Sequence, residues 1–351
     1  MEKMVNKSFF YKKKILITGN TGFLGSWLTL FLLNKGASIT GVSNSTNKDN
    51  LFKILNLKKK INYFHFNLKN EKKIQLFFKK KKFDIIIHLA AEPLVFKSFN
   101  FPKETIENNF LTTLKILKYV NNKKTKLFLN FTSDKVYKNL DKKNLSYNEN
   151  SELFGSDPYS FSKSCSDMLV KMWSDNFKTS NIKYINVRCG NIIGGADWNE
   201  KRIVTDIIGC LFKNKKLALR NPKSTRPWIH VYEVCNYLLE LIKNNKRVKD
   251  KYSAWNIGPD KSDNKNVKWI TTSFFKQHGK KIKSIKYEKS KFKEKIYLNI
   301  DNSKINKFLI KKLRFRIEKR IQLTYEWYKE FFHNREQIAK YTINQINKFI
   351  I

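Results

Sequence analysis

The sequence is 351 residues long, 41% hydrophobic and 14% aromatic, which suits a large α/β unit or two ordinary domains and excludes global disorder. Its 71 Lys and Arg residues against 29 Asp and Glu residues give a formal net charge of +42, and such a charge first suggests a nucleic-acid or anionic-surface partner. However, 62 of the 71 are lysines spread through nearly every segment, and no nucleic-acid-binding motif organises them, so we expect no nucleic-acid partner.

Between residues 13 and 131, short apolar runs alternate with longer helical patterns. The apolar runs predict strands at 15–17, 38–42, 62–66, 83–88 and 126–131. Amphipathic patterns fill the gaps, and the first of them predicts a helix over 22–35. Strands buried on both faces that alternate with helices are typical of a parallel, doubly wound sheet. The sequence therefore predicts a Rossmann-type α/β fold.

Three glycines, Gly19, Gly22 and Gly25, follow the first predicted strand and open the first predicted helix. In such a loop the first glycine permits a tight turn, the second lets backbone N–H groups approach a pyrophosphate, and the third lets the helix pack closely on the sheet. An incidental glycine-rich turn is the alternative, but the strand before and the amphipathic helix after favour a dinucleotide site. The end of the second strand carries neither carboxylate nor arginine, so the choice between NAD and NADP stays open there.

A helix start is predicted at residues 157–163, where Asp157 suits the N-cap and Pro158 the first helical position. Tyr159 and Lys163 then lie on one face of the helix, four residues apart. An ammonium group beside a phenol lowers the phenol pKa and favours its use as a base. The alternative is an accidental Tyr/Lys pair on the surface, which is common in a chain so rich in both residues.

A second polar group, Ser133, Asp134 and Lys135, follows the fifth predicted strand. Active sites of α/β sheets lie at the carboxyl ends of strands. A hydroxyl, a carboxylate and an ammonium group in succession could act there as hydrogen-bond donor, acid and base. For these three residues alone, a solvated turn is the default interpretation.

Four of the nine arginines, Arg188, Arg202, Arg220 and Arg226, fall within the 39 positions from 188 to 226. Because the composition otherwise favours lysine, their concentration indicates a need for the planar guanidinium, which binds phosphate groups in a bidentate manner. Ordinary salt bridges could account for one or two of them, and Arg188, in a predicted strand, is the best candidate for a structural role.

In this order, these elements resemble the extended short-chain dehydrogenases/reductases, and within them the CDP-glucose 4,6-dehydratases. The narrower resemblance extends from about residue 13 to residue 330 and rests on five segments. They are 88–95 (HLAAEPLV), 132–135 (TSDK), 188–198 (RCGNIIGGADW), 220–222 (RNP) and 226–230 (RPWIH). Lys135 is part of it, since the relatives that act on dTDP-glucose have glutamate at this position.

The resemblance implies an NAD-dependent lyase that converts CDP-D-glucose to CDP-4-dehydro-6-deoxy-D-glucose and water, in deoxysugar and O-antigen-type polysaccharide biosynthesis. Tyr159 would take the 4-hydroxyl proton, Lys163 would hold the nicotinamide ribose and tune Tyr159, and Ser133 would bind the 4-oxygen. Lys135, in its neutral form, would then be the base at C5 and Asp134 the acid for the departing 6-hydroxyl. The swapped assignment stays open because coupled groups can share these roles.

The same resemblance implies the binding residues and the domain organisation. Tightly held, recycled NAD would contact Tyr159, Lys163 and a further set: Gly19, Thr21, Gly22, Phe23, Gly25, Ala90, Ala91 and Asn109. The nucleotide sugar would be held by Asn191, Arg202, Arg220 and Arg226. Residues 1–187 would form the NAD-binding domain, 188–330 a smaller mixed substrate-binding domain that can interleave with the sheet, and 331–351 a helical tail.

Two other functions are compatible with parts of the sequence. A different nucleotide-sugar 4,6-dehydratase or a 4-epimerase would share Tyr159, Lys163 and the glycine loop, but an epimerase would not need Asp134 and Lys135. A non-catalytic, basic nucleotide- or RNA-binding protein would not need the Tyr/Lys/Ser set.

The sequence also suggests where the protein works. No signal peptide is evident, the longest apolar stretch (23–33) is too short to span a membrane, and the four cysteines lack C-x-x-C spacing. We expect a cytoplasmic homo-oligomer, a dimer or tetramer, without a metal.

Overall fold

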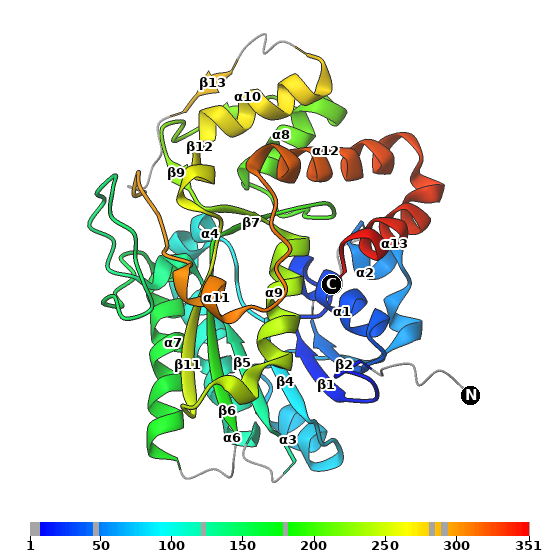
Figure 1. Cartoon of the computed structure of the whole chain (residues 1–351), viewed down its shortest axis with the longest axis vertical. Helices are drawn as coiled ribbons and strands as arrows, with labels where there is room; N and C mark the ends of the chain where they lie inside the picture. Colours follow the sequence, from blue (N-terminus) through cyan, green and yellow to red (C-terminus); the bar gives the residue numbers. More distant parts are fainter. Residues whose placement is uncertain are drawn as a thin grey trace.

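A seven-stranded parallel sheet forms the centre of the protein, seen here in a computed structural model that describes residues 8–44, 49–120, 124–177, 182–280, 285–288 and 294–350 (Figure 1). Its strand order is β11-β6-β5-β4-β1-β2-β3, and every neighbouring pair is parallel. The strands are β1 (Lys14–Thr18), β2 (Ser38–Ser43), β3 (Asn62–His65), β4 (Ile85–His88), β5 (Leu127–Phe131), β6 (Lys183–Cys189) and β11 (Tyr252–Ile257).

Successive residues of β1 point to opposite faces of this sheet, and each face has its own hydrophobic core. Ile15 and Ile17 belong to one core and Leu16 to the other. The first core is covered by α1 (Phe23–Asn34) and α9 (Val231–Lys243), and the second by α3 (Glu71–Lys80), α6 (Thr112–Val120) and α7 (Pro158–Asn176). Shorter helices connect these elements: α2 (Leu51–Ile54), α4 (Val95–Asn100) and α5 (Pro102–Ile106). This arrangement confirms the predicted doubly wound α/β fold.

The strand order reverses between β1 and β4, where β2 lies on one side of β1 and β5 lies beyond β4. In open α/β sheets a crevice forms at such a point, at the carboxyl ends of the strands. The glycine loop after β1 and the polar segments after β4 and β5 therefore converge on one place.

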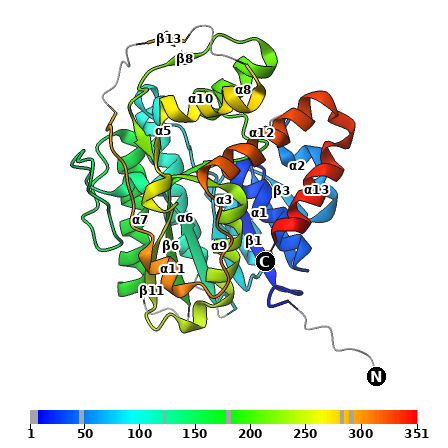
Figure 2. The ribbon, with the colours of Figure 1, turned by 45° about the horizontal axis from the view of Figure 1, so that its top comes forward.

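A smaller part of the chain lies over these carboxyl ends, at the top of Figure 1, and is brought forward in Figure 2. Its helices are α8 (Ile203–Lys213), α10 (Val267–His278) and α12 (Ile317–His333), with α11 (Ser303–Phe308) and α13 (Ile338–Phe349) lower down. Its short strands pair in twos: β7 (Asn191–Ile193) with β10 (Trp228–His230), β8 (Ala218–Leu219) with β13 (Lys286–Tyr287), and β9 (Thr225–Arg226) with β12 (Lys265–Asn266).

The chain crosses between the two parts more than once. After β7, α8, β8, β9 and β10 it returns as α9, which packs on α1, and as β11, the edge strand beside β6. Residues 231–257 thus pack on the sheet through α9 and extend it through β11. No helix of the described residues is long and apolar enough to cross a membrane.

Candidate active site

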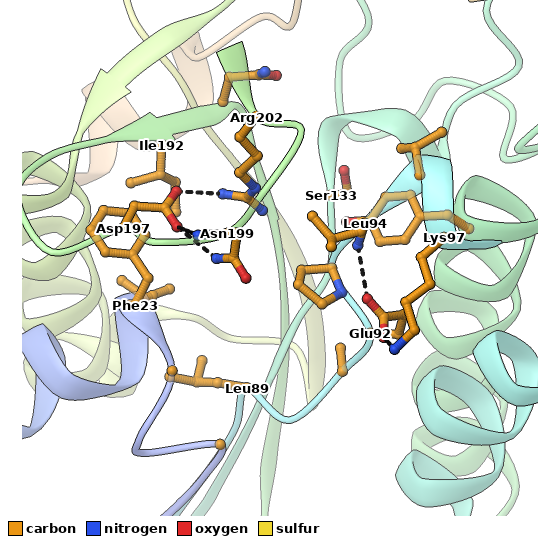
Figure 3. A pocket seen from close by; sticks show the side chains of 18 of the residues that line it. Phe23, Leu89, Glu92, Leu94, Lys97, Ser133, Ile192, Asp197, Asn199 and Arg202 are labelled. Carbon is orange, nitrogen blue, oxygen red and sulfur yellow. Dashed lines mark hydrogen bonds and ion pairs between the residues drawn. The ribbon is translucent and has the colours of Figure 1, made fainter. Parts of the chain in front are cut away.

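A cavity of about 780 Å³ lies between the carboxyl ends of the strands and the smaller part of the chain. This volume is in the range of small-molecule sites. In Figure 3, Arg202 and Asp197 lie on one side of it, and Ser133, Leu94, Glu92 and Lys97 lie on the other. The glycine loop, the segments after β4 and β5, and the first turns of α7 and α8 all contribute lining residues.

The glycine loop has the geometry that a pyrophosphate requires. Gly19 has φ +72°, and a Cβ there would lie 2.8 Å from the backbone nitrogen of Ala90. A Cβ on Gly25 would lie 2.2 Å from the carbonyl oxygen of Gly19, so only glycine allows this approach. Gly22 is the N-cap of α1 and offers no side-chain cap, so the first N–H groups of the helix can bind an anion. The residues present therefore fit a dinucleotide.

Of the other predicted cofactor residues, Thr21, Phe23, Ala90 and Ala91 line the cavity. Asn109 does not line it, because its side chain is buried and fully used by the protein. Its Oδ1 accepts from the Glu92 amide at 2.7 Å, and its Nδ2 donates to the Glu92 carbonyl at 3.2 Å and to the Ser162 hydroxyl at 2.9 Å. Asn109 thus links the segment after β4 to α7 by hydrogen bonds.

The first turn of α7 brings the predicted catalytic residues together. Asp157 caps the helix, as predicted, by accepting from the Ser160 amide at 2.9 Å. Lys163 is buried and donates to the Phe131 carbonyl at 3.0 Å, which ties the helix to the end of β5. Tyr159, Lys163, Ser133, Asp134 and Lys135 consequently share one cavity.

The Tyr159 phenol has a higher pKa than a free tyrosine. Burial raises the pKa to about 12, while a hydrogen bond with Ser133 and the charge of Arg202 oppose the rise without cancelling it. Burial therefore outweighs the lowering that sequence reasoning assigned to a neighbouring lysine. At neutral pH the phenol is protonated, and it becomes a base only when its surroundings become more positive.

Asp134 has an environment that favours the protonated form of its carboxyl. Burial raises the pKa of its carboxyl, and the charges of Lys135 and Arg226 together with a Ser133 hydrogen bond only partly offset this. Its Oδ1 accepts from the Ser133 hydroxyl at 3.0 Å. Its Oδ2 is buried and has no hydrogen-bond partner among the described residues. A protonated Oδ2 would have a hydrogen free to donate to a ligand.

Lys163 is expected to make stability depend on pH, because burial lowers its pKa from 10.5 to about 8. Between those values the native amine is neutral while the unfolded chain still carries the ammonium, so this residue's contribution to stability rises with pH. The free energy of unfolding of the wild-type protein should therefore rise relative to that of Lys163→Met by about 3 kcal/mol from neutral pH to pH ~10.5. Urea denaturation of both proteins measures this, and a constant difference would contradict it.

The predicted arginines on the other side of the cavity are partly occupied by groups of the protein itself. Arg202 donates to Asp197 at 3.1 Å, and Asn199 Nδ2 donates to the same carboxylate at 2.6 Å (Figure 3). Arg220 donates to the Lys201 carbonyl at 3.1 Å. Arg226 is buried and donates to three backbone carbonyls, of residues 225, 295 and 296. All three arginines and Asn191 line the cavity, but the guanidinium of Arg226 is mostly occupied by protein groups.

A buried ion pair beneath α7 was not found by sequence reasoning. Arg188, in β6, donates to both carboxylate oxygens of Asp167 at 2.9 and 2.7 Å, and Thr132 donates to the same carboxylate at 3.1 Å. The negative charge of Asp167 also opposes the fall in the Lys163 pKa. The structural role suggested for Arg188 agrees with this geometry, and the i, i+4 spacing from Lys163 to Asp167 was the available signal for its partner.

Several known proteins resemble this chain in sequence or in fold. The sequence model of the NAD dependent epimerase/dehydratase family matches residues 15–258. The CDP-glucose 4,6-dehydratase of Salmonella typhimurium is 31% identical over 346 residues, which cover 95% of this chain and 96% of that protein. Two solved structures are 19% identical, each with a TM-score of 0.80. They are the dTDP-glucose 4,6-dehydratase of Streptomyces venezuelae (92% and 98% of the two chains) and the UDP-glucose 4-epimerase of Thermotoga maritima (90% and 99%).

Proposed function

Because this chain belongs to the NAD dependent epimerase/dehydratase family, we propose that it converts CDP-D-glucose to CDP-4-dehydro-6-deoxy-D-glucose and water, as a step in deoxysugar synthesis for surface polysaccharides. The observation that carries this proposal is the environment of Asp134, a buried carboxyl with a raised pKa that lies beside Ser133 in the cavity of Tyr159 and Lys163. An epimerase needs no such acid, whereas elimination of the 6-hydroxyl does.

The cofactor is NAD, and the glycine loop described above would hold its pyrophosphate. Tyr159 and Lys163 would hold the nicotinamide end, and Asn109 would act indirectly by positioning the segment around Glu92. When bound, NAD would supply the acceptor for the C4 hydride and the donor that returns it to C6.

Tyr159 acts first, by taking the proton of the sugar 4-hydroxyl. Ser133 hydrogen-bonds this phenol, and its single O–H would donate to the 4-oxygen in place of Asp134 Oδ1, so it would orient both groups. Since burial keeps the Tyr159 pKa high, the positive charge that Lys163 and Arg202 place around the cavity supports the deprotonated form when the ligands are in place.

Elimination follows at C5 and C6. A ketone at C4 acidifies the C5 hydrogen, whose proton passes to the amine of Lys135. The C–H electron pair forms the C5–C6 double bond, and the 6-oxygen leaves as water with the proton of Asp134. Asp134 and Lys135 form a coupled pair, so the reverse assignment is the second possibility.

The diphosphate would lie against Arg202, Arg220 and Asn191, which have exposed edges along the cavity. Arg226 would join them by releasing Glu294, its weakest partner at 3.4 Å. Residues 188–230 and 258–330 would accordingly form most of the nucleotide-sugar site.

The test offers the purified protein CDP-glucose, dTDP-glucose, UDP-glucose and GDP-mannose. A product lighter by one water, with deuterium from solvent at C5, is expected from CDP-glucose. Turnover of another nucleotide sugar but not of CDP-glucose would contradict the proposed substrate. A changed C4 configuration without loss of water would favour an epimerase.

We also propose that the protein is a homo-oligomer that pairs through α7. Phe161, Met168 and Met172 are 44%, 45% and 42% exposed and lie at i, i+7 and i+11 on one face of this helix. A helix face of this kind can pair with its own copy about a twofold axis. The double variant Met168→Lys with Met172→Lys should sediment as a monomer at concentrations where the wild type is a dimer or tetramer. Leu76→Lys, at an exposed leucine of α3, is the control, and an unchanged mass for the double variant would contradict the interface.

The working compartment that we propose is the cytoplasm. All four cysteines are free thiols, and Cys189 and Cys235 are buried. Reduced cysteines that never pair are typical of proteins in reducing compartments.

A further inference from the structure

The wall of the cavity beyond the arginines is formed by α8, β8 and the start of α10. Its lining residues include Val204, Asp206, Ala218, Asn221 and Val267. Arg202 is the N-cap of α8 and Arg220 directly follows β8, so both arginines adjoin this wall. A nucleotide sugar with its diphosphate on these arginines and its sugar at Tyr159 therefore extends its nucleobase to this wall.

Asp206 is an acidic residue in this wall, close to the arginines that would bind the diphosphate. It lies one turn beyond Arg202, and its amide donates to the Arg202 carbonyl at 2.9 Å. Burial raises the pKa of its carboxyl, while Arg220 and a hydrogen bond from the Lys201 backbone oppose this rise. Among the described residues it forms no ion pair with Arg220 or with another cation.

A carboxylate at this place repels the diphosphate, so it favours binding only if another part of the ligand donates a hydrogen bond to it. Cytosine presents an exocyclic amino group, which carboxylates accept from, whereas uracil and thymine present a carbonyl oxygen at the same ring position. Two acceptors facing each other in a partly desolvated wall would leave both without a hydrogen bond.

We propose that Asp206 accepts a hydrogen bond from the exocyclic amino group of cytosine and thereby selects CDP-linked over UDP- and dTDP-linked sugars. This inference rests on the proposed function in so far as a nucleotide sugar occupies the cavity. It adds the residue that distinguishes the base.

The decisive variant is Asp206→Asn. The amide oxygen can still accept from the Lys201 backbone, so the turn before α8 is retained, while the new NH₂ group can donate to a carbonyl. We expect the affinity for CDP to fall about ten- to hundredfold relative to UDP and dTDP, the range for one base-specific contact. Asp206→Ser should lose the preference for CDP without gaining affinity for UDP. Calorimetric titration of the NAD-loaded protein with CDP, UDP and dTDP measures each Kd.

Glu200→Gln is the matched control, because Glu200 is exposed, lies near Asp206 and carries the same charge without lining the cavity. It should leave the ratio of CDP to UDP affinity unchanged. An equal change in both variants would assign the effect to net charge and overturn the inference, as would an unaltered ratio in Asp206→Asn and Asp206→Ser. Since binding is measured without turnover, a preference for CDP without dehydration of CDP-glucose would refute the proposed function and leave this inference standing.

Discussion

Replacing Lys135 with methionine is expected to stop elimination while leaving the oxidation at C4 intact. Lys135 lines the cavity beside Asp134, and methionine keeps most of the length of the side chain without a basic group. Removal of a general base typically lowers a rate by about 10²- to 10⁴-fold. With CDP-glucose, the variant should accumulate reduced cofactor in a single turnover and should incorporate no deuterium at C5.

Lys138→Met is the control for this experiment, since Lys138 belongs to the same segment but forms an exposed ion pair with Glu152 at 3.0 Å. It should dehydrate CDP-glucose at the wild-type rate. If Lys135→Met still exchanges the C5 hydrogen, Lys135 is not the base. Asp134→Asn would then be expected to lose the exchange instead, because the two roles are exchanged.

The fold was predictable because its signals are local. Apolar runs such as 15–17 and 83–88 are buried on both faces, so their composition alone indicates parallel strands. Asp157 and Pro158 determine where α7 begins, and that start places Tyr159 and Lys163 on one face. The glycine loop was equally predictable from the sequence, because only glycine tolerates the contacts at Gly19 and Gly25.

Long-range consequences of folding were not predictable in the same way. The sequence suggested that Lys163 lowers the pKa of Tyr159, but the depth of burial reverses the net shift, and burial depends on segments far apart in the chain. Asn109 was predicted to contact the cofactor, yet its amide is used by Glu92 and Ser162. Likewise, the arginine cluster indicated a diphosphate, but not that Arg226 is largely held by backbone carbonyls of residues 295 and 296.

Replacing Tyr159 with phenylalanine is expected to abolish both halves of the reaction, in contrast to Lys135→Met. Without the phenol no group removes the 4-hydroxyl proton, so the C4 ketone never forms and C5 is never acidified. Loss of a general base at this step corresponds to about a 10²- to 10⁴-fold slower oxidation. Within the time in which the wild type completes one turnover, neither reduced cofactor nor C5 deuterium should appear, although CDP should still bind, because the arginines proposed to hold the diphosphate are unchanged.

The pH dependence of the first step separates this role from a structural one. Since burial raises the pKa of Tyr159 to about 12, the oxidation rate of the wild type should rise with pH wherever the phenol of the bound complex is still protonated. The residual rate of Tyr159→Phe should lose this rise, and Tyr63→Phe, at a tyrosine that does not line the cavity, should keep it. Stopped-flow measurement of cofactor reduction gives all three profiles. A Tyr159→Phe profile parallel to that of the wild type would show that another group takes the proton. Retention of the first oxidation in Lys135→Met together with its loss in Tyr159→Phe would assign the two proton transfers to two different residues.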